Sequence, residues 1–520
     1  MRNNREKLNI LIIFATSVSV NFYYGSIGVF PIDTFAFFDS ANLINKGLLP
    51  IRDYWTSNGF LVDLIQSVFF KLFGSNWKIY LLHSSLINFL FTFMTYKFLI
   101  NEGLSKEISL LYGVSVGILA YPSVGVPFPD HHSLIFSIIA SYFFIYSLNK
   151  KSNLFLFLTI LFLFIGFLCK QVPAAFFIIL IGFYLIYFSF KSNNFKLLYK
   201  AVFFALVIFF IFILFLVFNK IEINNFLIQY IFFPLSIGSE RSNSLSISSI
   251  IISLLNEFKF FTILLLIIFF QFIQSEQARY KLKLKKKNFS IQVFFIFLVL
   301  ICIINQEIMK NQNIIFFILP ILLGLIHSEI IKVQKKKYLI YIVLILNIFI
   351  TFKYHERFNE NRKFMELEKI DKAIFVKAEN ISQKLKGLKW LTSNYNGKLE
   401  VEINLLQESI NFLRLNKKNS VIITYYQFIN SELDHEIYSP NRWYTSDGAS
   451  YPLKKNKFHE KYLNFFKNKL LEKKIKKIFT IKPLDKDVFV FLLKSNCVQT
   501  LKINDILSEH DITNCFAKKN

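Results

Sequence analysis

Two acidic side chains stand directly beside long apolar runs, where each is placed to act on a substrate. Asp130 opens the sequence Asp-His-His at residues 130–132, between the apolar runs 112–127 and 134–146. Asp33 follows Pro31 just after the first apolar run. Partial removal from water raises the pKa of a carboxylate, so Asp33 is a candidate base for deprotonating an alcohol. The structural alternative for both residues is a helix cap.

The histidines of the Asp-His-His sequence are compatible with two kinds of ligand, a metal ion or a phosphate group. Together with Asp33 and Asp130, His131 and His132 supply ligand types that suit a divalent metal ion, with the two aspartates as the candidate metal ligands. Neighbouring residues on a helix point about 100° apart, so both histidines reach one ion only with distortion. Alternatively, the amides at the helix start and the histidines bind a phosphate group.

Three basic residues are candidates for binding an anionic phosphate. Lys170 ends an apolar run, Arg241 lies in the sequence FFPLSIGSERSN, and Arg52 lies in the long segment after Asp33. The alternatives are a lysine that extends from a helix end to the membrane surface, and for Arg241 a solvated loop residue.

The composition predicts that these residues are positioned by membrane helices. The chain has 520 residues, of which 54% are hydrophobic, and its mean hydropathy is +0.44. Apolar runs near 20 residues are typical of helices that span a bilayer. We predict about eleven spans, at residues 8–24, 79–100, 107–121, 131–148, 153–169, 172–190, 198–218, 258–273, 290–304, 313–330 and 338–352.

The basic residues predict the orientation of the spans. The formal net charge is +26, and much of it lies in alternate loops with the sequences RNNREK, NKKS, KSNNFKLLYK, ARYKLKLKKK and KVQKKK. Positive loops face the cytoplasm, so the N-terminus is predicted there, in a plasma membrane of the bacterial inner-membrane type. This placement argues against nucleic acid as the partner. The loops 25–78, 122–130, 170–171, 219–257 and 305–312 are then outside, as is everything after 352.

Residues 353–520 are more polar and predict an extracytoplasmic α/β domain behind the membrane domain of residues 1–352. Helical spacing is present at 368–391, 405–415 and 459–477, and strand-like runs at 420–426, 477–481 and 487–493. The loop 427–452 follows the first strand, at the edge where α/β sheets bind ligands. Cys497 and Cys515 are placed where a disulfide is feasible, although two cysteines alone do not establish one.

The first predicted outer loop resembles that of the GT-C membrane glycosyltransferases, of the protein O-mannosyltransferase and aminoarabinose-transferase type. An aspartate after the first span is followed by a small-residue helix, a proline turn with aspartate and tryptophan, a glycine, and an apolar helix ending in FFKLFG. A second acid precedes the fourth span, and LCKQVPA at 168–174 and LPILLG at 319–324 are also similar. The matching residues in this sequence are Asp33, Ala41, Gly47, Pro50, Asp53, Trp55, Gly59 and Asp130.

The resemblance implies an all-α polytopic membrane domain that transfers a sugar from a polyprenyl-phosphate carrier to an extracytoplasmic glycan, lipid or protein, with inversion. Asp33 would be the base, and Lys170, Arg241 and Arg52 would contact the phosphate. A transporter or flippase for a lipid-linked sugar is the main alternative, and a structural or sensory protein is the third. The gathering of polar residues on one face, rather than at the midplane, favours chemistry at that face.

Overall fold

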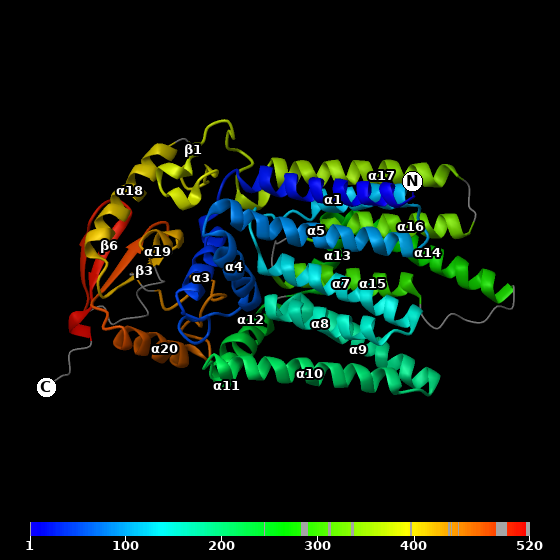
Figure 1. Ribbon diagram of the computed structural model, residues 1–520, viewed down its shortest axis with the longest axis horizontal. Coiled ribbons are helices and arrows are strands. Elements are labelled where there is room, and N and C mark those ends of the chain that lie inside the picture. The colour runs from blue at the N-terminus through cyan, green and yellow to red at the C-terminus, as the bar shows by residue number, and fades with distance from the viewer. Residues whose placement is uncertain are drawn as a thin grey trace.

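The computed structural model is an elongated molecule with a helical bundle at one end and an α/β domain at the other (Figure 1). The short helices α3 Ala36–Asn45 and α4 Phe60–Phe73 lie between these two parts. The structure describes residues 2–243, 245–281, 290–309, 314–333, 337–395, 398–434, 437, 439–445, 447–484 and 497–515.

Every predicted span coincides with a helix of the bundle, and these helices run along the long axis of the molecule (Figure 1). Eight of those described, α1, α5, α7, α9, α10, α14, α15 and α17, are long and apolar enough to cross a membrane. The protein is therefore mostly helical, and these helices have the length and composition of those in multi-pass membrane proteins. Helix α8 has 17 residues, and α6 and α16 have 14 each. The bounds are α1 Arg2–Gly25, α5 Trp77–Asn101, α6 Lys106–Leu119, α7 Pro129–Lys150, α8 Asn153–Cys169, α9 Gln171–Ser192, α10 Lys196–Phe218, α14 Lys259–Lys281, α15 Ile291–Met309, α16 Leu319–Lys332 and α17 Tyr338–His355.

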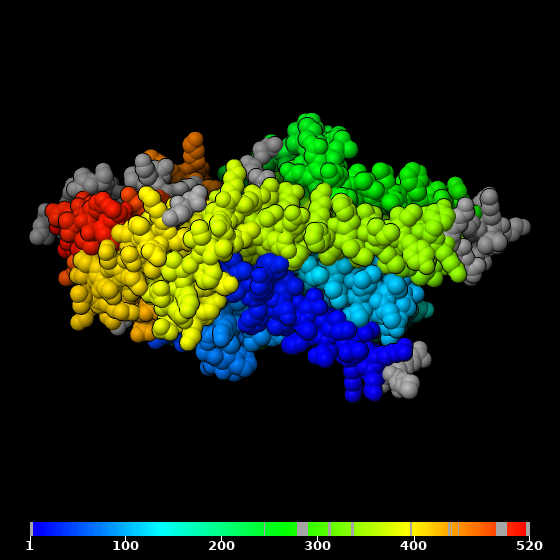
Figure 2. Space-filling view, turned by 90° about the horizontal axis from the view of Figure 1, so that it is seen from above, coloured from blue at the N-terminus to red at the C-terminus, as the bar shows by residue number. Residues whose placement is uncertain are grey.

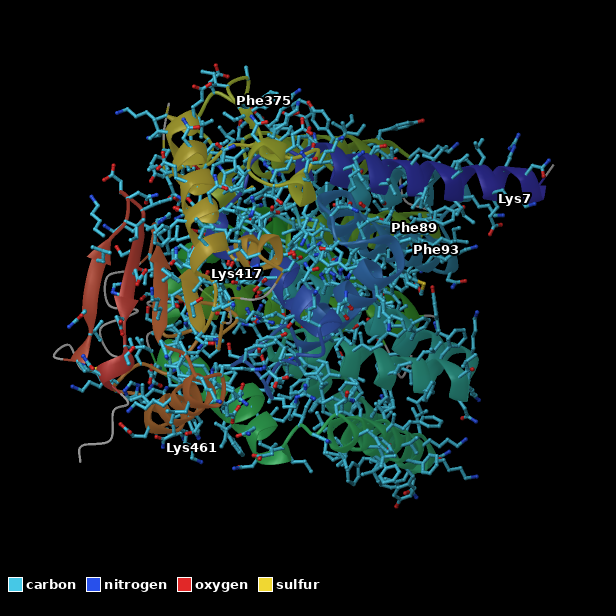
Figure 3. All side chains as sticks on the ribbon, turned by 60° about the vertical axis from the view of Figure 1, so that its left-hand side comes forward. Lys7, Phe89, Phe93, Phe375, Lys417 and Lys461 are labelled. Atoms are coloured by element: carbon cyan, nitrogen blue, oxygen red, sulfur yellow. A yellow bond between two sulfur atoms is a disulfide. The ribbon has the colours of Figure 1, made fainter. Side chains whose placement is uncertain are left out.

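The connections divide the bundle into a basic end and a domain end. Helix α1 begins at the basic end, where α7 meets α8, α9 meets α10, and α16 meets α17 (Figure 1). The domain end carries the long first loop and the α/β domain. Lys7 of α1 lies far from Lys417 and Lys461 of that domain (Figure 3). The loops predicted to be basic therefore lie at one end of the bundle, and the intervening loops lie at the other.

The first loop folds into the short helices that its sequence predicts. They are α2 Pro31–Thr34, α3 Ala36–Asn45 and α4 Phe60–Phe73. Helix α4 packs against α5 and α8, and α3 packs against α4 and α19 Phe428–Glu432 of the α/β domain. Gly59 precedes α4 with φ +70°, and a Cβ there would lie 2.4 Å from the ring of Phe37. Glycine is thus required where the loop turns back onto itself.

The predicted loop at 219–257 contains more structure than its sequence indicates. It folds into α11 Ile223–Phe226, the π-helix η1 Leu227–Phe232, α12 Phe233–Ser242 and α13 Ile247–Asn256. Helix α13 packs against α14 but leaves Ile247, Ile252 and Leu255 exposed. An exposed apolar helix beside spanning helices is suited to contact with lipid.

The α/β domain is built on a mixed sheet with the strand order β3-β4-β6-β5. Strands β3 Ser420–Thr424 and β4 Lys477–Ile481 are parallel, as the sequence predicts, and β5 Gln499–Lys502 and β6 Leu507–Asp511 are antiparallel additions. Helices α18 Leu399–Asn416 and α20 His459–Glu472 match two predicted helices. The predicted strand at 487–493 lies outside the described residues. A disulfide joins Cys497 to Cys515.

The helix predicted at 368–391 is wrong. This segment contains 3-10 turns (η5 Ala378–Asn380, η6 Gln383–Leu385) between the short strands β1 Val376–Lys377 and β2 Lys389–Trp390. The backbone N–H of Lys389 donates to the Ser26 carbonyl over 2.8 Å, and that of Val29 donates to the Leu391 carbonyl over 2.9 Å. Pairing with the chain that leaves α1 therefore replaces helical hydrogen bonds, and in Figure 2 this segment covers the end of the bundle beside α1.

Candidate active site

Five charged residues from distant parts of the chain gather at the domain end of the bundle. They are Asp33 in α2, Asp130 in α7, Lys170 between α8 and α9, Arg241 in α12, and Asp447 in the loop that precedes α20. The charges of Asp130, Lys170 and Asp447 all act on the carboxyl of Asp33. We call these five residues the charged cluster. Four of them are among the residues that the sequence predicts for the site.

Asp33 is half-buried in the first turn of α2 and is not its N-cap, which is Phe30. The pKa of Asp33 is raised from 3.8 to about 7, chiefly by desolvation and also by the negative charges of Asp130 and Asp447, while Lys170 opposes the shift. A base whose pKa lies near neutral pH is ionised often enough to accept a proton and basic enough to hold it. Asp33 has this property through its surroundings alone.

Asp130 forms a buried ion pair with Lys170. The lysine Nζ lies 2.7 Å from Oδ1 and 2.6 Å from Oδ2, and the side chains are 2% and 12% exposed, respectively. The N-cap interpretation of Asp130 is wrong, because Phe128 is the N-cap of α7 and Asp130 lies inside the first turn. The carboxylate turns to Lys170 because that cation stands at the α8–α9 junction, where Ser133 Oγ donates to the Lys170 carbonyl over 2.9 Å.

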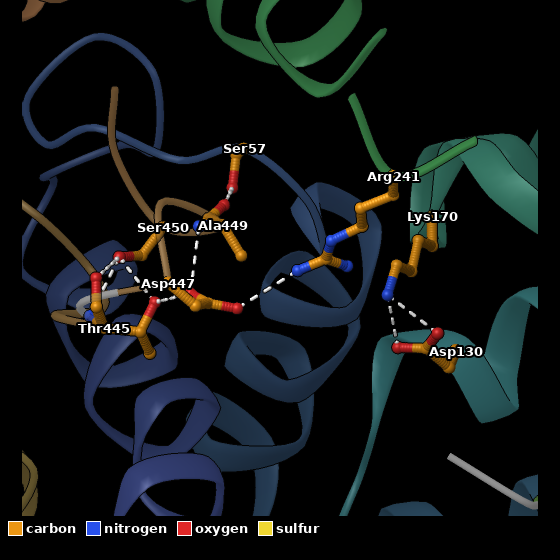
Figure 4. Close-up of polar contacts among 8 residues, drawn as sticks. All are labelled: Ser57, Asp130, Lys170, Arg241, Thr445, Asp447, Ala449 and Ser450. Atoms are coloured by element: carbon orange, nitrogen blue, oxygen red, sulfur yellow. Dashed lines mark hydrogen bonds and ion pairs between the residues drawn. The ribbon is translucent and has the colours of Figure 1, made fainter. Parts of the chain in front are cut away.

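Arg241 reaches the cluster through Asp447 (Figure 4). Its Nη2 lies 3.1 Å from Oδ2 of Asp447. The other carboxylate oxygen accepts hydrogen bonds from Thr445 Oγ1 at 2.7 Å and from the Ala449 backbone N–H at 3.0 Å. The Ser57 hydroxyl donates to the Ala449 carbonyl over 3.0 Å. The loop that carries Asp447 is therefore tied to the first loop.

The two histidines bond to protein groups rather than to the cluster. His131 Nε2 donates to the Ala120 carbonyl over 2.6 Å, and His132 Nδ1 donates to that of Phe128 over 2.9 Å. The Nε2 atoms of His132 and His83 are 3.2 Å apart. Both predicted histidines are at most 2% exposed. They pack and orient the start of α7, close in sequence to Asp130.

The polar contacts of Arg52 are with residues outside the charged cluster. Its guanidinium pairs with Asp53 at 2.7 Å and donates to the carbonyls of Asn219 at 3.0 Å and Gly47 at 2.6 Å. These bonds hold the proline turn of the first loop against the end of α10. Within the described part of the chain, there is no group of three or more histidine, cysteine, aspartate or glutamate residues arranged to hold a metal ion.

Sequence reasoning missed the contribution of the loop after β3. Besides Asp447, this loop supplies Arg442, whose Nη1 lies 2.6 Å from Oδ2 of Asp63 in α4 and whose Nη2 donates to Asn58 over 2.8 Å. Asn430 of α19 donates to Asp39 of α3 over 2.9 Å. The only sequence signal for these contacts is the length of the polar loop 427–452 at a sheet edge. Its partners on the first loop are not encoded by any local pattern.

No protein-family model matches the sequence, and none of the curated proteins matches it.

Proposed function

We propose that the protein is an integral-membrane glycosyltransferase. It moves a sugar from a polyprenyl-phosphate carrier to an acceptor hydroxyl on a glycan, lipid or protein, at the domain end of the bundle. One observation supports this proposal most strongly: burial beside Asp130 raises the pKa of Asp33 to about 7. The cations Lys170 and Arg241 belong to the same cluster. The spanning helices support a donor whose tail stays in lipid.

In the proposed reaction Asp33 takes the proton of the acceptor hydroxyl. The acceptor oxygen attacks the anomeric carbon, the bond from that carbon to the phosphate oxygen breaks, and polyprenyl phosphate leaves with the bonding electrons. One displacement inverts the anomeric configuration. The leaving phosphate needs no strong acid, but it gains negative charge, which nearby cations stabilise in the transition state.

Lys170 is the first candidate for the phosphate. Its ammonium group has three protons, and the two carboxylate oxygens of Asp130 engage two of them. A phosphate oxygen can take the third without breaking the ion pair, which holds the lysine in one direction. Arg241 approaches from α12, on a different helical segment. A divalent metal ion bound by Asp33 and Asp130 is a second way to offset the phosphate charge, and the proposal does not require it.

The same proposal assigns the basic end to the cytoplasm and the domain end to the outside of a bacterial-type inner membrane. The distribution of lysine and arginine supports this orientation. The disulfide between Cys497 and Cys515 supports it independently, since disulfides persist in oxidising compartments.

The test uses cells that lack the gene, complemented with the wild-type chain, Asp33→Asn or Asp505→Asn. Asp505 is an exposed aspartate of the α/β domain and serves as a matched control. Mass spectrometry of surface glycans, lipids and proteins should show one sugar addition with the wild type and Asp505→Asn. Asp33→Asn should lose at least about 100-fold of the transfer rate, since general base catalysis contributes about 10²–10⁴-fold.

Insertion of each variant into the membrane is measured alongside, because a misfolded chain also loses activity. Full activity of an inserted Asp33→Asn chain contradicts the assignment of the base. Movement of intact lipid-linked sugar across vesicles, with no new glycosidic bond, contradicts the transferase and favours the transporter.

A further inference from the structure

A polar groove lies between the first loop, the segment after α10 and helix α20. Its volume is about 470 Å³, within the range of roughly 300–1,000 Å³ that is usual for sites of small ligands. Lys461 of α20, labelled in Figure 3, is one of the residues that line it. The groove joins the bundle to the α/β domain, and it is separate from the charged cluster in its lining residues.

The groove is rich in side-chain amides. Asn224 and Asn225 line the side formed by α11, and Asn464 and Asn468 line the side formed by α20. Asn464 and Asn468 are exposed and are four residues apart on one helix, so they present their amides on the same face. An amide donates and accepts hydrogen bonds at once, as is required to bind vicinal hydroxyl groups.

Trp55 supplies a second, independent sign of a ligand. The residue is only 2% exposed and lines the groove, and its indole Nε1 has no hydrogen-bond partner among the described residues. A buried N–H without a partner costs about 1–3 kcal/mol, so such a donor is expected to meet an acceptor when the site is in use. The Trp55 ring packs edge-on against Tyr462 and Phe465 of α20, which fixes its direction.

The charged residues of the groove are of both signs, because Lys220, Lys461 and Glu222 line it as well as two cations that are held in ion pairs. Arg52 is paired with Asp53, and Lys469 is paired with Glu472 at 2.8 Å. Phe465 adds an aromatic surface of the kind that packs against the C–H faces of a ring. Amides, a buried indole N–H and an aromatic side chain together are the groups that bind the hydroxyls and ring faces of an oligosaccharide.

The wall of the groove is held rigidly and leads toward the charged cluster. Gln229 of the π-helix η1 accepts from the Thr56 N–H at 3.0 Å and donates to the Ile51 carbonyl at 3.0 Å. The chain then runs from Trp55 to Ser57, whose hydroxyl bonds the loop that carries Asp447. A ligand held at Trp55 thus lies on the same stretch of chain that reaches Asp33 and its neighbours.

We propose that this groove binds an oligosaccharide, which is the acceptor of the transfer reaction. The identity of the ligand as acceptor depends on the proposed function, whereas binding of an oligosaccharide does not. Groove residues hold the inner part of the glycan, and its free end extends to the charged cluster. The groove therefore selects glycan acceptors over simple alcohols or lipids.

Calorimetric titration of the full-length protein in nanodiscs tests this inference without any donor. The probes are trisaccharides of mannose, glucose, galactose and N-acetylglucosamine. At least one should bind saturably. The double variant Asn464→Ala/Asn468→Ala should weaken its binding by at least about tenfold, and Trp55→Phe by roughly 2- to 12-fold, as the loss of one neutral hydrogen bond predicts. Lys467→Ala, on the same helix but outside the groove lining, should bind like the wild type.

Asp33→Asn should also bind the trisaccharide with unchanged affinity. Binding of a trisaccharide by a wild-type protein that shows no transferase activity sinks the proposed function and leaves the groove as a glycan site. If none of the four trisaccharides binds, or if the two asparagine substitutions leave binding unchanged, the inference is overturned. Binding of phosphatidylglycerol vesicles alone also overturns it, and assigns the groove to lipid headgroups.

Discussion

The indole of Trp443 donates its Nε1 hydrogen to the backbone carbonyl of Ile32, the residue directly before Asp33. A loop of the α/β domain thereby fixes the short helix that carries the candidate base. Together with Asp447, which acts on the same carboxyl, it makes the last third of the chain a part of the charged cluster. The site is thus shared between the two parts of the molecule.

Replacing Trp443 by phenylalanine should slow transfer while leaving insertion and folding intact. The substitution keeps most of the apolar ring and removes the hydrogen bond that positions Ile32 and Asp33. We expect kcat to fall by about 10- to 100-fold, because small displacements of a reacting group are costly, and KM to change little. Trp77→Phe is the matched control, since the indole Nε1 of Trp77 is buried without a partner among the described residues. Equal losses in the two variants contradict a positioning role for Trp443.

The pH dependence of kcat/KM should report the pKa of Asp33. A base must be ionised to act, so activity should rise as the pH passes through about 7 and level off above it. Asp130→Asn removes a negative charge that raises this pKa, so its rising limb should move to lower pH. Lys170→Met removes a positive charge that lowers the pKa, so its limb should move to higher pH.

The opposite signs of these two shifts make the pH measurement diagnostic. Asp505→Asn should leave the profile where it is, because Asp505 is not among the charges that shift the pKa of Asp33. A rising limb that stays fixed in both Asp130→Asn and Lys170→Met shows that some other group is the base. The measurement compares profiles, so it remains informative even when the variants have lower rates.

Arg442→Gln should destabilise the contact between the first loop and the α/β domain. The pKa of Asp63 is raised to about 6 by desolvation, and Arg442 opposes that rise. Removal of one partner of a buried ion pair costs about 3–5 kcal/mol, because the other charge is left without compensation. Without Arg442 the folded-state pKa of Asp63 rises further above its ordinary 3.8. Stability is then highest at low pH and falls as the pH rises.

Thermal unfolding monitored at pH 5 and pH 8 checks this expectation. The melting temperature of Arg442→Gln should drop more at pH 8 than at pH 5. The double variant Asp63→Asn/Arg442→Gln removes both charges and should recover part of the loss, with little dependence on pH. A drop that is equal at both pH values, or that the double variant does not reduce, shows that the ion pair is not the cause.

The sequence predicts the helices well because an apolar run in a membrane must hydrogen-bond its own backbone N–H and C=O groups, which requires a helix. Residues 258–273 and 290–304, which look short in the sequence, belong to the longer helices α14 and α15, whose polar ends carry no apolar signal. The strands β3 and β4 are also predictable, since their five-residue runs are rich in isoleucine with phenylalanine or valine. Strand β5 is exposed along its whole length, so alternation gives no sign of it.

The candidate site is predictable only in part, because its partners come from separate places in the chain. Asp33, Asp130 and Lys170 each stand at one end of an apolar run, and this local sign picks them out, whereas Arg241 follows the polar residues Ser239 and Glu240. Asp447 and Arg442 have no such sign, since only the folded loop brings them to α2 and α4. The helix-like spacing at 368–391 fails for the same reason. A distant backbone partner decides the structure there, and local propensity does not.

The pairing of residues 26–29 with 389–391 has a consequence for the order of synthesis. The first loop is the earliest part of the domain end to leave the ribosome, yet it can be completed only when the final third of the chain has been made. Asp33 therefore remains outside its finished surroundings throughout insertion of the bundle. The charged cluster is therefore completed only after synthesis of the segment that carries Asp447, although Asp33 is synthesised near the start.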